Sequence, residues 1–242
     1  KLNPLCNQAA QALVNLQLQG ESYLEVLSRL HNFFQPETYV EIGVSFGSSL
    51  AKVSQKTFAV GIDPISSVKH KIKAKTKFFQ MTSDDFFRDC DLTNILSGRK
   101  IEMTFLDGLH TFEQILKDFL NIERYSSPET IVAVHDCLPI DPIVASPHRT
   151  TNFWTGDVWK LLPALRAYRP NLKIFVIPTP PSGLAIIKNL NPAEGPNLKK
   201  NYKKMFSSFK SLSFEDFEYV RDHSFKIIPN NWSSIKKQII SL

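Results

Sequence analysis

Acidic and imidazole side chains stand together at two places in the sequence, each directly after a short apolar run. Asp107 and His110 follow one run, and His135 and Asp136 end another. Burying such groups without partners costs several kcal/mol, so plain packing is a poor explanation of both pairs. We therefore expect a catalytic site in which His110 or His135 acts as a general base, because an unperturbed imidazole titrates at roughly pH 6.5.

Two other interpretations of these pairs stay open from the residues alone. Asp107 and Asp136, together with a histidine, offer the mixed oxygen and nitrogen ligands that a divalent metal accepts. Alternatively, the carboxylates and imidazoles pair with one another and cap the helices that follow. The residue types alone do not separate these roles.

A glycine-containing loop follows an earlier apolar run, at residues 41–49 (EIGVSFGSS). Its glycines let the backbone turn sharply beside a ligand, and the helix expected after it offers free backbone N–H groups. The loop is neither the GxGxxG of dinucleotide-binding proteins nor a phosphate-binding GK[ST] motif. Its acidic first residue would repel a pyrophosphate but suits an ammonium or sulfonium group. The candidate cofactor-binding residues here are Glu41, Gly43, Val44, Ser45, Gly47 and Ser48.

Polar residues also end the next two apolar runs. Asp63 lies about 20 residues beyond the first glycine, where an acidic side chain can accept hydrogen bonds from ribose hydroxyls. The alternative is a helix N-cap, with Pro64 as the first helical residue. Ser83 and Asp84 follow the third run, where they either border an adenine or cap a helix.

The apolar runs alternate with amphipathic segments, which indicates alternating strands and helices. Most runs show little polar alternation, as expected for strands buried on both faces of a parallel sheet. The clearest helix spans residues 111–125, with an apolar stripe at helical spacing. This order predicts a doubly wound α/β fold with helices on both faces of the sheet. The expected strands are residues 39–44, 58–62, 77–81, 101–106, 131–134, 172–177 and 184–187.

The two ends of the chain differ from this alternating middle. Two helices open the chain, and the second stops before Pro36. The last two strands are joined by residues 180–183, which cannot hold a crossover helix, so this pair should be antiparallel. Residues 154–159 (WTGDVW) either begin a helix or form an aromatic wall of an acceptor pocket. We expect one domain over residues 1–242, made of N-terminal helices (1–37), an α/β core (38–190) and a tail (191–242) with one helix near residues 214–220.

Composition limits the classes of partner. The net charge is +6, but the lysine clusters at residues 69–77 and 199–210 lack the interleaved aromatics of an RNA-binding signature, so nucleic acid is not the expected partner. No run approaches the roughly 18 apolar residues that a membrane span needs, and no membrane partner is expected. Cys6, Cys90 and Cys137 show no CxxC spacing, which favours a reducing, cytoplasmic setting.

These segments resemble the class I S-adenosylmethionine-dependent methyltransferases, in particular methyltransferase family 24. EIGVSFGSS and GIDP are similar to the first two motifs of the class, and LDGLHTFEQILKDF followed by IVAVHDC is similar to the subfamily. TGDVWK and PSGLAII look like its later portions, so the resemblance covers roughly residues 21–188. It implies a seven-stranded Rossmann-like sheet of order 3-2-1-4-5-7-6 with the last strand antiparallel.

The resemblance also implies how S-adenosylmethionine is bound. The glycine loop would frame its methionine moiety, and the ends of the next strands would hold its ribose and adenine. By position, Glu41, Gly43 and Gly47 belong to the first group, Asp63 binds the ribose, Pro64, Ser83 and Asp84 lie near the adenine, and Asp107 lies beside the sulfonium.

A divalent metal is a further implication, with one departure from the pattern. Asp107 and Asp136 match positions at which catechol-type O-methyltransferases place metal ligands, but the asparagine that follows the second aspartate there is Cys137 here. A thiol is a poor ligand for a hard cation such as Mg²⁺. We therefore expect a metal-free site with a histidine base.

The expected reaction is methyl transfer to an oxygen of a small molecule, such as a sugar, a glycan or a secondary metabolite. Three other classes stay open. A nicotinamide-dependent oxidoreductase would need the GxGxxG turn that the chain lacks. A metal-dependent hydrolase would use the Asp and His cluster, and a nucleic-acid-binding protein would use the lysines and show steep salt dependence.

Overall fold

Seven strands form one sheet in the order β3-β2-β1-β4-β5-β7-β6, in which β7 runs antiparallel to both of its neighbours. The computed structural model describes residues 4–241, apart from the side chains of residues 4–7, 10 and 195–200, which include those of Cys6, Lys199 and Lys200. The predicted strand order and the antiparallel last strand are confirmed. The strands are β1 (Thr38–Ile42), β2 (Phe58–Ile62), β3 (Lys75–Phe79), β4 (Met103–Leu106), β5 (Ile131–His135), β6 (Lys173–Ile177) and β7 (Leu184–Lys188).

The central strands β1, β4 and β5 are buried along their whole length, because helices cover both faces of the sheet there. The third strand differs from the expectation of burial on both faces. It pairs only with β2, so it is an edge strand, and Lys75 and Lys77 on it are exposed. Its lysines fit an edge position, where charge discourages pairing with another chain.

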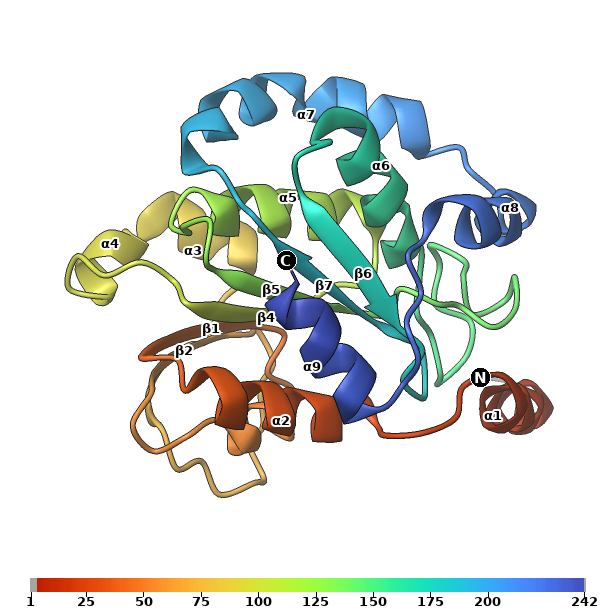
Figure 1. The fold of residues 1–242 in the computed structure, drawn as a ribbon, viewed down its shortest axis with the longest axis horizontal. Coiled ribbons are helices and arrows are strands. Elements are labelled where there is room, and N and C mark those ends of the chain that lie inside the picture. Colours follow the sequence, from red (N-terminus) through yellow and green to blue (C-terminus); the bar gives the residue numbers. More distant parts are fainter. Residues whose placement is uncertain (1–3, 242) are drawn as a thin grey trace.

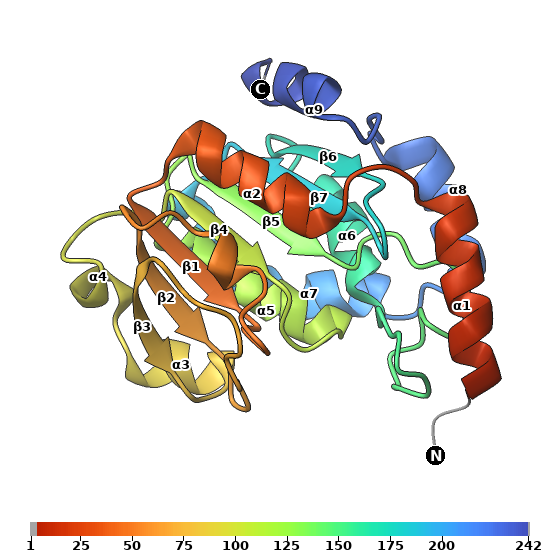
Figure 2. The same ribbon diagram turned by 90° about the horizontal axis from the view of Figure 1, so that it is seen from below.

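Helices pack on both faces of the sheet, as predicted (Figures 1 and 2). Helices α2 (Tyr23–Phe34) and α9 (Trp232–Ile240) cover one face. The other face carries α5 (Phe112–Glu123), α6 (Leu161–Tyr168) and α7 (Gly195–Phe209). The remaining helices are α1 (Pro4–Gln17), α3 (Ser83–Asp89), α4 (Leu92–Ile95) and α8 (Phe214–Ser224), with short 3₁₀ turns η1 (Leu50–Lys52), η2 (Val158–Lys160) and η3 (Pro192–Glu194).

Local sequence explains where the two long covering helices begin. Ser22 caps α2 in a reciprocal capping box with Glu25, and Thr111 accepts a hydrogen bond from the Gln114 backbone N–H at the start of α5. The apolar stripe of α5 then lies on the sheet, with Ile115 and Phe119 buried.

Three helices that the sequence suggested near the sheet edge are absent or begin later. The glycine loop leads into the 3₁₀ turn η1 instead of an α-helix, and the connection from β2 to β3 contains no helix at all. The helix expected from Asp157 likewise begins as η2, and α6 starts only at Leu161. The predicted helix dipole behind the glycine loop is therefore wrong, because a 3₁₀ turn this short aligns few peptide groups.

The tail contains three helices where the sequence predicted one. The expected helix is α8, and α7 and α9 flank it. In α7 the buried side chain of Met205 and the partly buried Phe206 and Phe209 are spaced at helical intervals, but many lysines hid this signal. Between α8 and α9, Ile227 forms a β-bridge with Val176 of β6. None of the described helices combines the length and apolar character needed to cross a membrane.

Candidate functional site

The loop after β1 is pressed against the end of β4 because of one glycine. Gly43 has a φ of +91°, and a Cβ on it would lie only 1.9 Å from the carbonyl oxygen of Asp107. No other residue type fits that approach or readily adopts that backbone angle. The glycine predicted for backbone turning thus brings the candidate cofactor loop beside the candidate catalytic cluster.

Glu41 lies inside the sheet, without a cation beside it. Its carboxylate accepts hydrogen bonds from the Tyr39 hydroxyl at 2.6 Å and from the Ser49 hydroxyl at 2.7 Å. Burial raises the pKa of this carboxyl to about 8, since water no longer stabilises its charge. Among the residues that the structure describes, no basic side chain forms an ion pair with Glu41, so its charge would be neutralised by a bound cation or by a proton.

Asp63 joins the loops that follow β1 and β2. Its carboxylate accepts hydrogen bonds from the backbone N–H of Ser45 at 2.8 Å and of Ile65 at 2.7 Å. Because no helix follows β2, the N-cap interpretation of Asp63 and Pro64 is wrong, and the bond to Ile65 closes a turn instead. Nearby, the Ser48 hydroxyl lies 3.1 Å from Nε2 of His70.

The two polar residues after β3 face different partners. Ser83 is buried and donates its hydroxyl to Asp118 at 2.6 Å, while Asp84 lies at the surface, 3.5 Å from Nζ of Lys117. Neither is the N-cap of α3, because Thr82 takes that position and accepts from the Asp85 backbone N–H. Burial raises the pKa of Asp118 to about 6. The Ser83 hydroxyl is thus committed to helix α5 in this structure.

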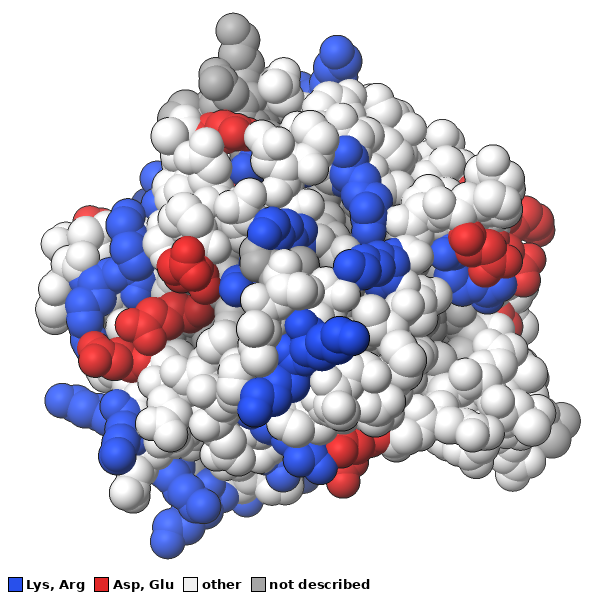
Figure 3. All heavy atoms as spheres, in the orientation of Figure 1, with Lys and Arg blue, Asp and Glu red and all other residues white. Residues whose placement is uncertain are grey.

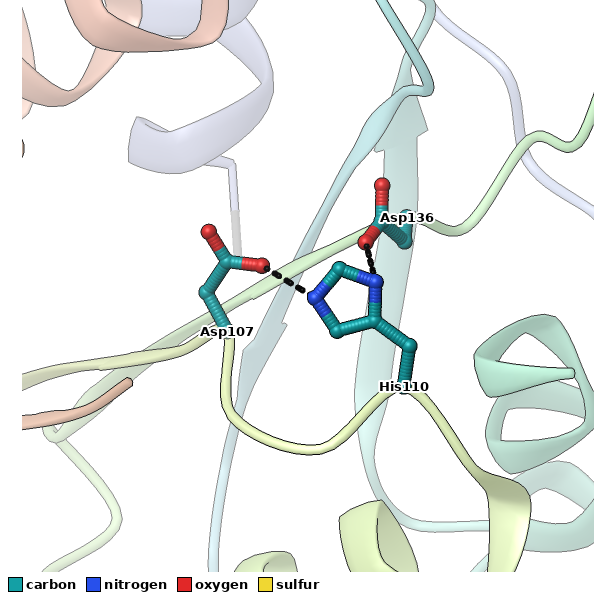
Figure 4. Close-up of side chains that lie close together, drawn as sticks. All are labelled: Asp107, His110 and Asp136. Atoms are coloured by element: carbon teal, nitrogen blue, oxygen red, sulfur yellow. Dashed lines mark ion pairs between the residues drawn. The ribbon is translucent and has the colours of Figure 1, made fainter. Parts of the chain in front are cut away.

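Asp107, His110 and Asp136 converge where β4 and β5 end (Figure 4). Nε2 of His110 lies 3.5 Å from Asp107, and its Nδ1 lies 2.9 Å from Oδ2 of Asp136, so the imidazole bridges the two carboxylates. Burial opposes a charged imidazole here, but the carboxylates of Asp136 and Asp107 outweigh it and raise the pKa of His110 to about 11. At neutral pH this histidine is therefore an imidazolium.

His135 lies next to the same carboxylates and is held by two residues that the sequence did not single out. Its Nδ1 lies 3.2 Å from Asp107, and its Nε2 lies 3.3 Å from the hydroxyl of Ser182, which donates to Asp136 at 2.5 Å. The ring of Tyr23, from α2, lies 4.1 Å from the ring of His135. Ser182 belongs to the loop between β6 and β7, so only the sheet order could have placed it here.

The Asp and His side chains pair with one another, as the third interpretation expected, but its second half, that they cap the following helices, is wrong. Thr111 is the N-cap of α5, and the backbone N–H of Phe112 donates to Asp157 at 2.6 Å. Asp136 also has a φ of +61°, a left-handed conformation that costs on the order of 1–3 kcal/mol outside glycine. This backbone conformation therefore costs free energy, although the Asp136 carboxylate caps none of the described helices.

Trp154 lies beside His110 on a loop that approaches very closely. The two rings stack at 5.2 Å, and Nδ1 of His110 donates to the Trp154 carbonyl oxygen at 2.7 Å. Gly156 makes this possible, because a Cβ there would lie 1.6 Å from the His110 carbonyl oxygen. Trp159 of the same segment is buried in the core and Asp157 precedes η2, as the helix interpretation expected, while an acceptor-pocket wall at Trp154 stays a prediction. The Asp157 carboxylate accepts from the Phe112 backbone N–H and lies 3.0 Å from Nζ of Lys160.

The cluster also offers ligands for a metal ion. Asp107, His110 and Asp136 each present one ligand atom within 4.8 Å of the others. Although Oδ2 of Asp136 lies near Nδ1 of His110, that nitrogen donates to Trp154, so this buried oxygen has no hydrogen bond. The thiol of Cys137 lies 3.4 Å from the Val134 carbonyl oxygen, and burial raises its pKa, so Cys137 is not a ligand in this arrangement.

Comparison with known proteins agrees with the geometry. Residues 40–137 match a family profile of methyltransferase family 24, described as a methyltransferase domain. The fold is similar to that of an O-methyltransferase from Bacillus cereus in complex with S-adenosylhomocysteine (TM-score 0.53, 13% identity, 78% of this chain and 92% of that chain). It is also similar to TomG, an O-methyltransferase of Streptomyces achromogenes involved in tomaymycin synthesis and crystallised with S-adenosylmethionine (TM-score 0.51, 16% identity, 79% and 92%). No curated protein matches at the level of sequence.

Proposed function

We propose that this class I S-adenosylmethionine-dependent methyltransferase transfers the methyl group to an oxygen of a small-molecule acceptor, at the cluster of Asp107, His110, His135 and Asp136. The observation that carries the proposal is the contact of Gly43 with Asp107, which sets the cofactor loop against that cluster. The structurally similar proteins named as O-methyltransferases support oxygen as the methylated atom. A hydroxyl of a sugar, a glycan or a secondary metabolite is the acceptor we expect.

On the cofactor side, the roles follow from charge and position. We assign Glu41 to the ammonium end of the cofactor, because it is a buried carboxylate without an ion-pair partner among the described side chains. Asp63 is assigned to the ribose, with Pro64 and Asp84 toward the adenine. Ser83 keeps only a secondary role there, since its hydroxyl is bonded to Asp118.

On the acceptor side, the cluster must take up a proton. The cofactor supplies a methyl group bound to a positively charged sulfur. Transfer of that methyl group from the sulfur to an acceptor hydroxyl would leave the hydroxyl proton to be taken up by the protein. A protonated His110 cannot accept it, so we assign the proton to Oδ2 of Asp136, a buried carboxylate oxygen that has no hydrogen bond and lies beside the His110 imidazole. Alignment of the reacting groups contributes most, on the order of 7–11 kcal/mol.

A divalent cation at the same cluster is a second candidate, favoured by the buried Oδ2 of Asp136 that lacks a hydrogen bond. Asp107, Asp136 and, once its imidazole had lost a proton, His110 would hold it, and the ion would stabilise negative charge on the acceptor oxygen. Calorimetric titration with Mg²⁺ tests this directly: binding that is lost in Asp136→Asn supports the metal, and the absence of any heat leaves the metal-free site.

Two measurements test the proposed reaction. Calorimetry should detect binding of S-adenosylhomocysteine and none of NAD, whereas tight NAD binding would point to an oxidoreductase. A panel of hydroxylated acceptors and a matched panel of amines are then incubated with labelled S-adenosylmethionine. Label transferred to amines alone would contradict oxygen as the acceptor atom.

A further inference from the structure

The loop between β2 and β3 forms a basic surface beside the candidate cofactor loop. Residues 64–83 contain five lysines and no acidic residue. Lys69, Lys71 and Lys73 are exposed and lie on the helix-free part of this connection. Figure 3 shows lysine and arginine side chains gathered at the lower left, over the loops that follow β1 and β2 in Figure 1. Lys75 and Lys77 protect the edge strand, but that explanation does not extend to the loop lysines.

Large apolar side chains are exposed at the same edge of the sheet. Ile65 is 83% exposed, Leu109 58% and Phe46 50%. They come from the loops after β2, β4 and β1, and because these strands are parallel, the three loops emerge at one edge. Single exposed apolar residues need no explanation, but three on adjacent loops next to a basic segment indicate a binding surface.

The basic and apolar parts are held together by specific contacts. The backbone N–H groups of Ser67 and Lys69 donate to the carbonyl oxygens of Ser45 and Phe46, both at 2.9 Å. Nζ of Lys69 lies 4.1 Å from the centre of the Phe46 ring. These contacts hold Lys69 against the exposed Phe46, while Lys71 and Lys73 continue the basic segment toward the start of β3.

We propose that this basic apolar rim, formed by Phe46, Ile65, Lys69, Lys71, Lys73 and Leu109, binds the surface of an anionic lipid bilayer. Lysines near a membrane gain from its negative surface potential, and exposed aliphatic and aromatic side chains gain by entering the interface between headgroups and acyl chains. An RNA backbone would use the lysines but would leave Ile65 in water. Binding to a membrane surface requires no spanning helix. The inference does not depend on the proposed methyl transfer.

The test is sedimentation with phosphatidylcholine vesicles that contain phosphatidylserine, compared with pure phosphatidylcholine vesicles. The wild-type chain should bind the anionic vesicles, and added salt should weaken binding. Changing Lys69, Lys71 and Lys73 to Gln should lower partitioning by on the order of 100-fold, about fivefold for each lysine. The matched control changes Lys203, Lys204 and Lys237 to Gln, which removes the same charge from α7 and α9, and it should lower partitioning severalfold at most.

Ile65→Ser tests the apolar part at constant charge, and we expect a loss of about tenfold. Thermal melting of each variant verifies that it is folded. Equal losses in the loop and control triple variants would overturn the proposal, because binding would then depend on net charge alone. Absence of vesicle binding by the folded wild-type chain would overturn it too. If the wild-type chain instead bound a single-stranded RNA oligonucleotide, and the loop variant did not, the surface would be a nucleic-acid site.

Discussion

Glu41 and the pair Asp107 and Asp136 are acidic groups at one sheet edge, yet their charges are balanced in different ways. Glu41 receives two hydroxyl donors, and burial holds its pKa at about 8. The two aspartates face imidazoles instead, and although burial opposes this, the charges of His135 and His110 keep the pKa of Asp107 well below its usual range. A carboxyl without an internal cation is suited to receive one from a ligand. Carboxylates that already have cations are suited to proton movement.

The largest effect should come from removing an imidazole beside Asp107 and Asp136. His110→Gln should lower turnover by about 10²–10⁴-fold and leave the affinity for S-adenosylhomocysteine nearly unchanged, because His110 bridges the two aspartates whereas Glu41 is bonded to Tyr39 and Ser49. Turnover is measured with any acceptor that the wild-type enzyme methylates, and affinity by calorimetry. His135→Gln is the parallel variant. Full activity in both would remove the imidazoles from the mechanism.

The next largest effect should come from Asp63, which is assigned to the ribose of the cofactor. Asp63→Ala should weaken binding of S-adenosylhomocysteine by about 10–100-fold, because it removes a charged acceptor for hydrogen bonds and also releases the Ser45 backbone N–H. Asp63→Asn keeps an acceptor oxygen and is the matched control, with a smaller loss. If Asp63→Ala bound the ligand as tightly as wild type, the ribose assignment would be wrong.

The affinity for the cofactor product should depend on pH through the carboxyl group of Glu41. A carboxyl with a pKa of about 8 is mostly protonated at lower pH, so a cationic ligand must first displace that proton. Affinity for S-adenosylhomocysteine should therefore rise with pH up to about 8, by at most about tenfold per pH unit, and level off above it.

In Glu41→Gln the amino group of the ligand still titrates, but the carboxyl group of the protein is gone. Its affinity should be lower than that of the wild type at pH 8 and should lack the rise toward that pH. Parallel pH profiles for wild type and variant would show that Glu41 does not bind the ammonium.

The smallest effect is expected at Ser182, which positions its neighbours without reaching the reacting atoms. Removing its hydroxyl in Ser182→Ala takes one hydrogen bond from Asp136 and one contact from His135. Turnover should fall by roughly threefold to tenfold, since one such bond is worth about 1 kcal/mol. Ser182→Thr keeps the hydroxyl and should recover most of the loss, with KM unchanged in both variants.

The hydrophobic periodicity of the sequence predicted the sheet well, but it predicted the tail and the segment after the glycine loop poorly. The strand order and the helix at residues 111–125 follow from buried apolar runs and a clear stripe, which local sequence specifies strongly. Helix α7, which was missed in the tail, carries many lysines, and the helix wrongly expected after the glycine loop is only a short 3₁₀ turn.

The same distinction applies to the candidate site. Asp107 and Asp136 could be found because each ends an apolar run, and strand ends of a parallel sheet meet. Tyr23 and Ser182 could not, because one lies on a helix far earlier in the chain and the other on an antiparallel connection. The pKa of about 11 at His110 also depends on distances that no spacing in the sequence reveals.

The β-bridge between β6 and the tail has a consequence for how separate molecules of this protein remain apart. Val176 exchanges backbone hydrogen bonds with Lys226 and Ile228, so the outer strand of the sheet is already partly occupied by the chain itself. A molecule that ended after α8 would present that strand as an open template, and its copies would be prone to join edge to edge. Residues 226–228 thus cover part of one margin of the sheet, and the lysines on β3 protect the opposite margin.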